Sequence, residues 1–371
     1  MALRAGTLIS NLFMMSEETQ ISRLIERSGE VLSRCSLDNG AIVAANPEPG
    51  SSSRGAKDYR LVWLRDAMYV CRAADILDLP IRENYLRWCF SVENLHEEGM
   101  FSEKYAADGT RMGFPFQVDQ AGSVLMTIAD HADAGGDTVT FDELARSIAN
   151  PLCDFWNGES FDQPAQDLWE ERYVFPDMRG NFTYSLAMCA AGLDRAGEIY
   201  ANKRWRQTSE EMRQRLDTGC EEYFSRSFGD FPDERIDASA LGVLWPAGFI
   251  SPKNARMRKT VGLIEKKLVR DGGVCRYEHD EYDGWMYEGR IYRRKGAGYW
   301  PLLTFWLSIC LVRMGEAERA RQYYRQVLHD LGDESDIPEQ IFGNDIQESV
   351  SPLAWSHAMF VIASRELGYI S

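Results

Sequence analysis

The sequence contains no apolar run of the roughly 20 residues that a membrane-spanning helix needs, and residues 1–13 make a poor secretion signal. Its eight cysteines are scattered without a Cys-x-x-Cys pair, mostly among apolar residues, which predicts reduced and buried thiols. The five histidines form no ligand pair, and neither a P-loop nor a dinucleotide-binding glycine motif is present. We therefore expect a cytoplasmic protein without a metal or another cofactor.

Positive charge is also scarce. The 371-residue chain has 41 Lys and Arg against 57 Asp and Glu, which gives a net charge of −16. Phosphate groups are repelled by such a charge, so nucleic acid and anionic membranes are excluded as partners. A neutral ligand such as a sugar meets no such penalty. The ten tryptophans fit this reading, because most would fill the core while a few could stack on sugar rings.

Helical periodicity covers most of the chain. The expected helices are residues 17–35, 64–79, 83–97, 118–133, 141–157, 182–200, 203–225, 238–248, 254–270, 297–314, 316–331 and 352–367. No stretch alternates with period two between hairpin turns. Apart from the Gly/Ser-rich piece at residues 50–55, which reads as a loop, no linker divides the chain. The pattern predicts an all-α protein of one domain.

Two glutamates stand out because each lies in a gap between helices beside an aromatic residue or a proline. Glu170 lies in the run DLWEER at residues 167–172, and Glu339 follows Pro338. Hydrolysis of a glycosidic bond needs two carboxyl groups on opposite sides of that bond. Loops on a rigid scaffold are the usual place for such groups. For single glutamates in an acidic chain, the plainer interpretation is solvated loop charge.

Eight short motifs, in order along residues 55–365, resemble those of the family 15 glycoside hydrolases, the glucoamylase-like enzymes. They are YxxxWLRD (59–66), QVD (117–119), LWEER (168–172), FTYS (182–185), DASAL (237–241), WPLLTFWL (300–307), PEQ (338–340) and PLAWSHA (352–358). The resemblance implies an (α/α)6 toroid of six helical hairpins with a funnel at one end. Residues 1–50 would be an N-terminal segment with the first helix, and residues 51–371 the glucoamylase-like catalytic domain, in one domain overall.

The resemblance also implies a reaction. Glu170 would be the general acid and Glu339 the general base of an inverting enzyme, whose two carboxyl groups lie about 6.5–9.5 Å apart. It would release β-glucose from the non-reducing ends of α-gluco-oligosaccharides, with α-1,4 or α-1,6 linkages, or both. An α,α-trehalase of the same family and a non-catalytic sugar-sensing relative remain alternatives. The sequence leaves the linkage open.

Sugar-binding residues are implied by the same motifs. Arg65 and Asp66 would bind the distal hydroxyls of the terminal glucose, and Glu171 and Arg290 the next sugar. Phe114 and Phe116 stand where many family members have a tryptophan behind the acid. The full set of expected binding residues is Tyr59, Trp63, Arg65, Asp66, Trp169, Glu171, Arg290 and Trp355.

Overall fold

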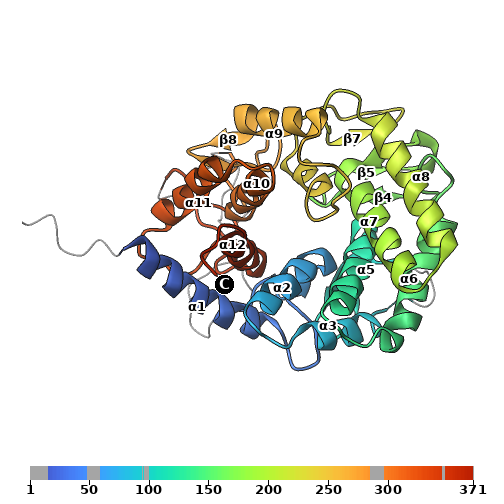
Figure 1. The fold of residues 1–371 in the computed structure, drawn as a ribbon, viewed down its shortest axis with the longest axis horizontal. Coiled ribbons are helices and arrows are strands. Elements are labelled where there is room, and N and C mark those ends of the chain that lie inside the picture. Colours follow the sequence, from blue (N-terminus) through green and yellow to red (C-terminus); the bar gives the residue numbers. More distant parts are fainter. Residues whose placement is uncertain are drawn as a thin grey trace, which may run out of the picture.

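Two concentric rings of helices make up most of the computed structural model, which describes residues 16–47, 59–93, 95, 100–284, 296–344 and 347–370 (Figure 1). The outer ring consists of α1 (Glu17–Cys35), α3 (Arg82–Cys89), α6 (Asp142–Asp154), α8 (Lys203–Gly219), α9 (Ala255–Leu268) and α11 (Ala317–Leu331). The inner ring consists of α2 (Leu64–Ile76), α5 (Val118–Asp133), α7 (Thr183–Ile199), the 3-10 helix η4 (Ala238–Val243), α10 (Pro301–Arg313) and α12 (Ala354–Glu366).

The inner ring is closed. Each inner helix packs on the next one, and α12 packs back on α2. Inner helices are buried almost all round, as in α10, where every residue from Pro301 to Leu311 is buried. Outer helices bury one stripe and expose the other, as α11 does with its buried residues Ala320, Tyr324 and Val327. The prediction of an all-α toroid of paired helices is confirmed.

Helix boundaries follow the sequence pattern closely, with two clear exceptions. The predicted helices at residues 17–35 and 118–133 match α1 and α5, whereas the helix expected at residues 238–248 is a short 3-10 helix that ends at Val243. Pro246 lacks an amide hydrogen and Gly242 is a poor helix former, so the segment cannot sustain an α-helix. The expected helix at residues 83–97 ends at Cys89.

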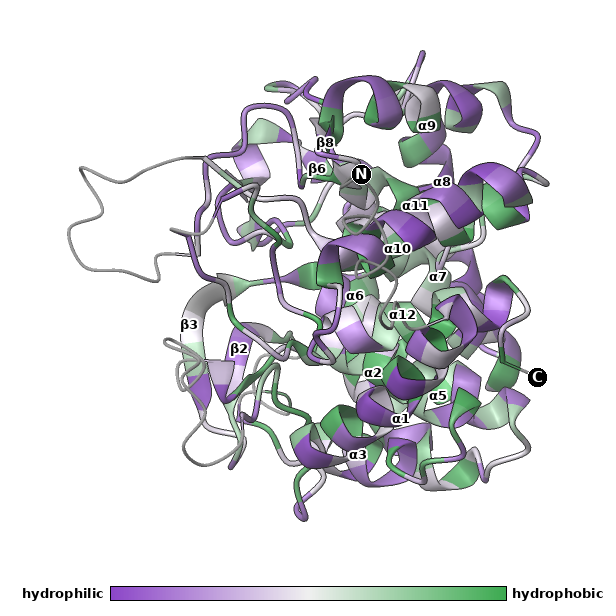
Figure 2. Ribbon diagram, turned by 90° about the vertical axis from the view of Figure 1, so that its left-hand side faces the viewer, coloured by the Kyte–Doolittle hydropathy of each residue, from purple (hydrophilic) through white to green (hydrophobic). Residues whose placement is uncertain are grey.

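Short strands, which the sequence analysis did not anticipate, cover one end of the rings. A five-stranded sheet runs in the order β1 (Leu61–Val62), β2 (Ser102–Ala106), β3 (Arg111–Phe116), β4 (Ala165–Gln166) and β5 (Tyr173–Val174). Two small ladders pair β6 (Asn181–Phe182) with β7 (Ser227–Phe228), and β8 (Val269–Arg270) with β9 (Gly273–Val274). Figure 2 shows β2, β3, β6 and β8 toward the same end of the molecule. Strands this short have too few residues to show alternation.

Side-chain caps begin only some of the helices. The outer helices α1, α8 and α9 are capped by the side chains of Ser16, Asn202 and Asn254, and the inner η4 by Asp237. No side-chain cap satisfies the N-termini of the inner helices α2, α5, α7, α10 and α12. Instead α2 and α5 carry Asp66 and Asp119 in their first turns, where a carboxylate complements the positive end of the helix dipole.

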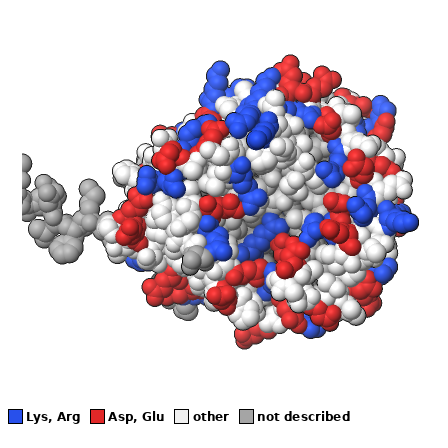
Figure 3. All heavy atoms as spheres, viewed as in Figure 1, with Lys and Arg blue, Asp and Glu red and all other residues white. Residues whose placement is uncertain are grey.

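The end of the molecule opposite the strands faces the viewer in Figure 3, and its basic and acidic side chains are interspersed. All eight cysteines are free and buried, as the sequence predicts. Among the described residues, none of the helices has the length and apolar character required to cross a bilayer.

Close packing within the inner ring gives a stability test. A Cβ on Gly122 of α5 would lie 2.3 Å from the backbone of Met188 in α7, whereas exposed Gly262 of α9 has open space around it. We expect Gly122→Ala to lower the free energy of unfolding by about 1–3 kcal/mol through overpacking. Gly262→Ala should raise it by about 0.5–1 kcal/mol through helix propensity. Chemical denaturation measures both, and equal stabilities would contradict the close approach of α5 and α7.

Candidate active site

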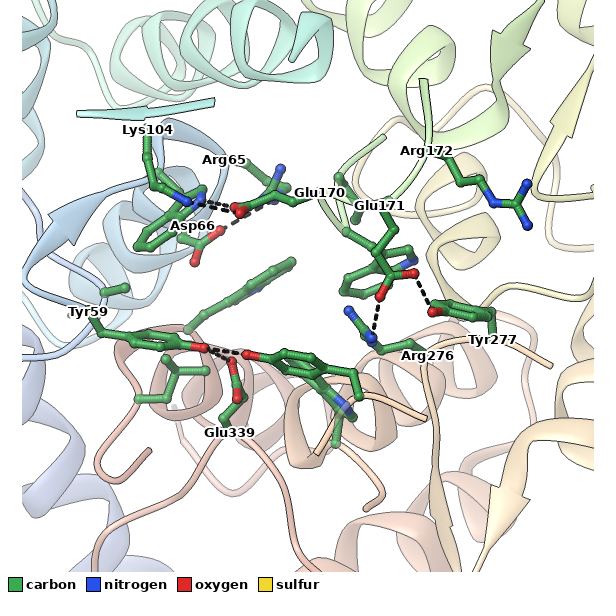
Figure 4. Close-up of a pocket in the computed structure, with 18 of the residues that line it drawn as sticks. Tyr59, Arg65, Asp66, Lys104, Glu170, Glu171, Arg172, Arg276, Tyr277 and Glu339 are labelled. Carbon is green, nitrogen blue, oxygen red and sulfur yellow. Dashed lines mark hydrogen bonds and ion pairs between the residues drawn. The ribbon is translucent and has the colours of Figure 1, made fainter. Parts of the chain in front are cut away.

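A cavity of about 750 Å³ opens at the strand end of the rings (Figure 4). Its walls come from the loop after β4, from β2, from the first turns of α2 and α12, and from the loop before α12. The cavity collects these expected site residues: Tyr59, Trp63, Arg65, Asp66, Trp169, Glu170, Glu171, Glu339 and Trp355. Arg290 lies outside the described residues. Residues far apart in the sequence therefore meet in one place.

Glu170 sits in a tight turn that a buried carboxylate holds. Its backbone has a φ of 62°, in the left-handed region that residues other than glycine seldom occupy. Asp167 stabilises this turn because its Oδ1 accepts hydrogen bonds from the amides of Glu171 and Arg172, at 2.9 and 3.1 Å. The other Asp167 oxygen accepts from Arg226 at 2.5 Å. Such strain persists where surrounding contacts over-determine the backbone, as in many active sites.

Two donors converge on the Glu170 carboxylate. The indole Nε1 of Trp63 donates to Oε1 at 2.5 Å, and Nζ of Lys104 lies 3.0 Å from Oε2. Lys104 also pairs with Glu103, its neighbour in β2. Burial by itself would lower the pKa of Lys104, but these two carboxylates outweigh burial and raise it. The ammonium group thus remains charged and holds Glu170 in place.

Glu339 is buried and keeps one carboxylate oxygen uncommitted. The hydroxyl of Tyr59 donates to Oε1 at 2.8 Å, while buried Oε2 has no hydrogen-bond partner. Because the Tyr59 proton points to Glu339, the Tyr282 hydroxyl 3.0 Å away donates to the Tyr59 oxygen. Burial raises the pKa of Glu339 to about 7, against the lowering effects of Tyr59 and Arg276. In Figure 4, Glu339 and Glu170 lie on opposite sides of the cavity.

Arg65 and Asp66 line the inner wall of the cavity at the start of α2. Arg65 is buried and donates to Gln117 at 2.9 Å and to Asp119 at 3.1 Å. Its Nε lies 3.3 Å from Asp66, and its guanidinium lies over the Trp355 ring at 5.6 Å. Burial raises the pKa of Asp66 to about 7, although Arg65 lowers it. This part of the wall therefore offers a cation and a carboxyl group side by side.

The remaining part of the cavity is organised around Arg276, which sequence reasoning missed. Its guanidinium binds Asp280 through two hydrogen bonds of 2.8 Å and reaches Glu171 at the same distance. Tyr277 also donates to Glu171. Glu171 is thus held by an arginine and a phenol, next to Glu170. No motif marks Arg276, since it lies in an irregular segment after β9.

Tryptophans supply the apolar surface of the cavity. Trp169 packs edge-on against Trp300 at 5.9 Å, and its indole donates to buried Asp237 at 2.9 Å. Trp355 stacks on Tyr69 at 5.2 Å. Phe116 does not line the cavity, and nothing is described of the Phe114 side chain. The indole that contacts the Glu170 carboxylate belongs to Trp63.

Lys104 and Tyr282 are two further cavity residues that the sequence did not single out. Lys104 occupies a strand that the helical reading did not include, and Tyr282 lies in a long gap between predicted helices. The only sequence signal for either is its position in a gap rich in charged and aromatic residues. Their importance follows from contacts with Glu170 and with Tyr59, which lie 66 and 223 positions away.

The sequence of this chain is similar to those of known glycoside hydrolases. The sequence model of Glycosyl hydrolases family 15 matches residues 87–344. An uncharacterized glycosyl hydrolase of Methanocaldococcus jannaschii is 28% identical over 90% of this chain and 54% of its own length. A trehalase of Thermoplasma volcanium is 25% identical over 73% of this chain and 45% of its own length. The chain thus spans about half the length of these curated relatives.

Solved structures share the fold. A glycosidase variant superposes with a TM-score of 0.79, at 22% sequence identity, over 96% of this chain and 99% of its own. An identity this low supports the common architecture alone. It agrees with the closed double ring of helices described above.

The raised pKa of Glu339 predicts how stability depends on pH. Up to about pH 7 the folded protein keeps a proton on Glu339, whereas an unfolded glutamate ionises near pH 4.3. The folded state binds more protons between these values, so this group's stabilising contribution is lost as pH rises toward 7. Glu339→Gln cannot ionise. The free energy of unfolding of Glu339→Gln, relative to that of the wild type, should therefore be about 2 kcal/mol higher at pH 8 than at pH 5.

Urea unfolding at the two pH values measures this gain. Glu348→Gln, a substitution of an exposed residue in the same segment, controls for the change in net charge. A Glu339→Gln variant whose difference from the wild type does not change with pH would contradict the burial of an ionisable Glu339.

Proposed function

We propose that this chain, which belongs to glycosyl hydrolases family 15, hydrolyses α-glucosidic bonds with inversion of configuration. One observation carries the proposal. Glu339 lies across the cavity from Glu170 with one oxygen bound to Tyr59 and the other free. An inverting glycosidase needs such a pair, an acid on the side of the leaving oxygen and a base on the side of the attacking water.

Neighbouring side chains hold each carboxyl group at its place in the cavity. Glu170 donates a proton to the glycosidic oxygen, and Lys104 and Trp63 keep its carboxyl group in position. Glu339 takes a proton from water through Oε2, while the Tyr59 hydroxyl fixes Oε1 and so orients the free oxygen. The phenolic oxygen of Tyr59 also supplies negative charge density near the positive charge that develops on the sugar ring.

Exo action is the second part of the proposal. Buried Arg65 and half-buried Asp66 bind the hydroxyls at the non-reducing end of the terminal glucose, since a charged donor and acceptor discriminate hydroxyl positions by geometry. Trp355 and Trp63 would provide the apolar walls of this pocket, and Glu171, held by Arg276, contacts the next sugar. Release of one β-glucose at a time follows from a pocket that accepts only a chain end.

The substrate class is α-linked gluco-oligosaccharides with α-1,4 or α-1,6 bonds. Trehalose, which is α,α-1,1-linked, is the second candidate, and the similarity to the trehalase of Thermoplasma volcanium favours it. A non-catalytic sugar sensor is disfavoured, because both carboxyl groups are present and face the cavity. The chain's own second-sugar contacts, at Glu171, Arg276 and Tyr277, would decide between these substrates.

Substitution of the two carboxyl groups tests the mechanism. Glu170→Gln and Glu339→Gln should each lower kcat by about 10²–10⁴-fold, since each removes a proton transfer that the reaction needs. Exposed Glu348→Gln is the matched control and should retain wild-type turnover. Circular dichroism confirms that each variant is folded. Near wild-type turnover in Glu339→Gln would show that another group is the base.

The product's anomeric form tests the stereochemistry, and a substrate panel tests the linkage. Freshly released glucose should be the β-anomer by proton NMR, because water attacks opposite the leaving group. Initial α-glucose would overturn inversion. Hydrolysis rates of maltose, isomaltose and trehalose are compared, and a maltooligosaccharide blocked at its terminal 4- or 6-hydroxyl should resist hydrolysis. Cleavage of the blocked chain would contradict the role of Arg65 and Asp66.

A further inference from the structure

Three hydrogen bonds from the start of α12 hold the backbone immediately before Glu339. Both polar groups of Ile337 are used. Its carbonyl accepts from the amide of Leu353 at 3.0 Å, and its N–H donates to Nε2 of His357 at 2.9 Å. The Pro338 carbonyl accepts from Oγ of Ser356 at 2.8 Å. The proposed base is therefore attached to α12 through the two residues that precede it.

His357 can make its bond to Ile337 in only one protonation state. A backbone N–H donates, so Nε2 must carry a lone pair. On the other side of the ring, Nδ1 lies 2.9 Å from Oγ of Ser28, and that hydroxyl already donates to the Leu24 carbonyl at 2.7 Å. Ser28 must then accept from Nδ1–H. The contacts thus specify a neutral imidazole with its proton on Nδ1.

We propose that His357 is a positioning residue for the general base: its Nε2 acceptor, oriented by Ser28 of α1, fixes the Ile337 backbone and through it the place of Glu339. This inference rests on the proposed role of Glu339. The chain of bonds runs from the outer helix α1 through the imidazole to the residue two positions before the base. His357 itself does not line the cavity.

Burial suits His357 to this task. Its side chain and that of Ser28 are fully buried, and burial, helped by the charge of Arg27, lowers the pKa of His357 to about 3. The ring therefore stays an acceptor across the whole range in which Glu339 changes its charge. Glu339 itself is held by other bonds: Oε1 accepts from Tyr59, and its amide donates to the Val350 carbonyl. Loss of the His357 bond would leave Ile337 and Pro338 held to α12 only by Leu353 and Ser356.

A matched pair of substitutions separates positioning from packing. In His357→Asn, the side-chain amide lies where Nδ1 was and can keep the hydrogen bond to Ser28, but it does not reach Ile337. In His357→Gln, the amide oxygen can lie where Nε2 was and accept from Ile337, but the hydrogen bond to Ser28 is lost. Each variant loses one hydrogen bond of the same buried pair. Only the Asn variant loses the one that leads to the base.

We measure the melting temperature of each variant. We also measure its kcat and KM on whichever of maltose, isomaltose or trehalose the wild type cleaves. We expect His357→Asn to lower kcat by about 10–100-fold with KM changed less than about threefold, since a misplacement of about 1 Å has an effect of this size. His357→Gln should retain at least about ten times the kcat of His357→Asn, at a similar melting temperature. Equal kcat values in the two variants would overturn the inference.

Two further measurements cover the case in which neither variant folds. Ser356→Ala removes the bond to the Pro338 carbonyl without touching the imidazole, and it should lower kcat more than it changes KM. In the wild type, ¹⁵N NMR of His357 should report an unprotonated Nε2 and a protonated Nδ1 from about pH 5 to pH 8. A protonated Nε2 in this range overturns the proposal.

Glu339→Gln, measured beside these variants, tests the role of Glu339 as the base separately from the positioning role of His357. If Glu339→Gln retains turnover, the base assignment and the proposed function fail. If Glu339→Gln is inactive while His357→Asn and His357→Gln have equal kcat, the function stands and only the positioning role of His357 fails.

Discussion

Buried arginines must be neutralised, and this requirement shapes the active end of the molecule. Arg65, Arg226 and Arg276 are the buried arginines among the described residues, and each is paired with carboxylates that also hold a wall of the cavity. Arg226 binds Asp167, which supports the turn that carries Glu170, and Arg276 binds Glu171. Removing one partner from such a buried pair leaves an uncompensated charge, typically at a cost of about 3–5 kcal/mol. The cavity walls are therefore rigid for electrostatic reasons.

The closed ring of inner helices brings these groups together. The inner helices α2, α10 and α12 begin at the cavity, and their N-cap residues make no side-chain cap. Orphan amides and positive dipole ends favour carboxylates in that region. Asp66 and Asp119 supply such carboxylates in the first turns of α2 and α5, and both form ion pairs with Arg65. The same architecture that leaves helix ends open thus gathers acidic groups where a glycosidase needs them.

Burial gives the proposed base a raised pKa at the expense of stability. Asp66 and Glu339 are both shifted to a pKa of about 7 because the cavity removes them from water. An ionised carboxylate in such a place destabilises the fold. Tyr59 holds the Glu339 side chain, while His357 and Ser356 hold the backbone of the two residues before it. Oε2 of Glu339 has no hydrogen-bond partner, which suits its proposed role of binding the attacking water.

The 3.6-residue spacing of apolar positions was enough to predict an all-α protein. The double ring, and the set of residues that meet in the cavity, were predicted only through the motifs that resemble family 15. The spacing could not reveal β2 or the short η4, because short elements carry little periodic signal. Nor could it reveal Lys104, Arg276, Tyr282 or the imidazole of His357 as partners of the site. Their roles depend on contacts between distant segments, and only closure of the ring creates those contacts.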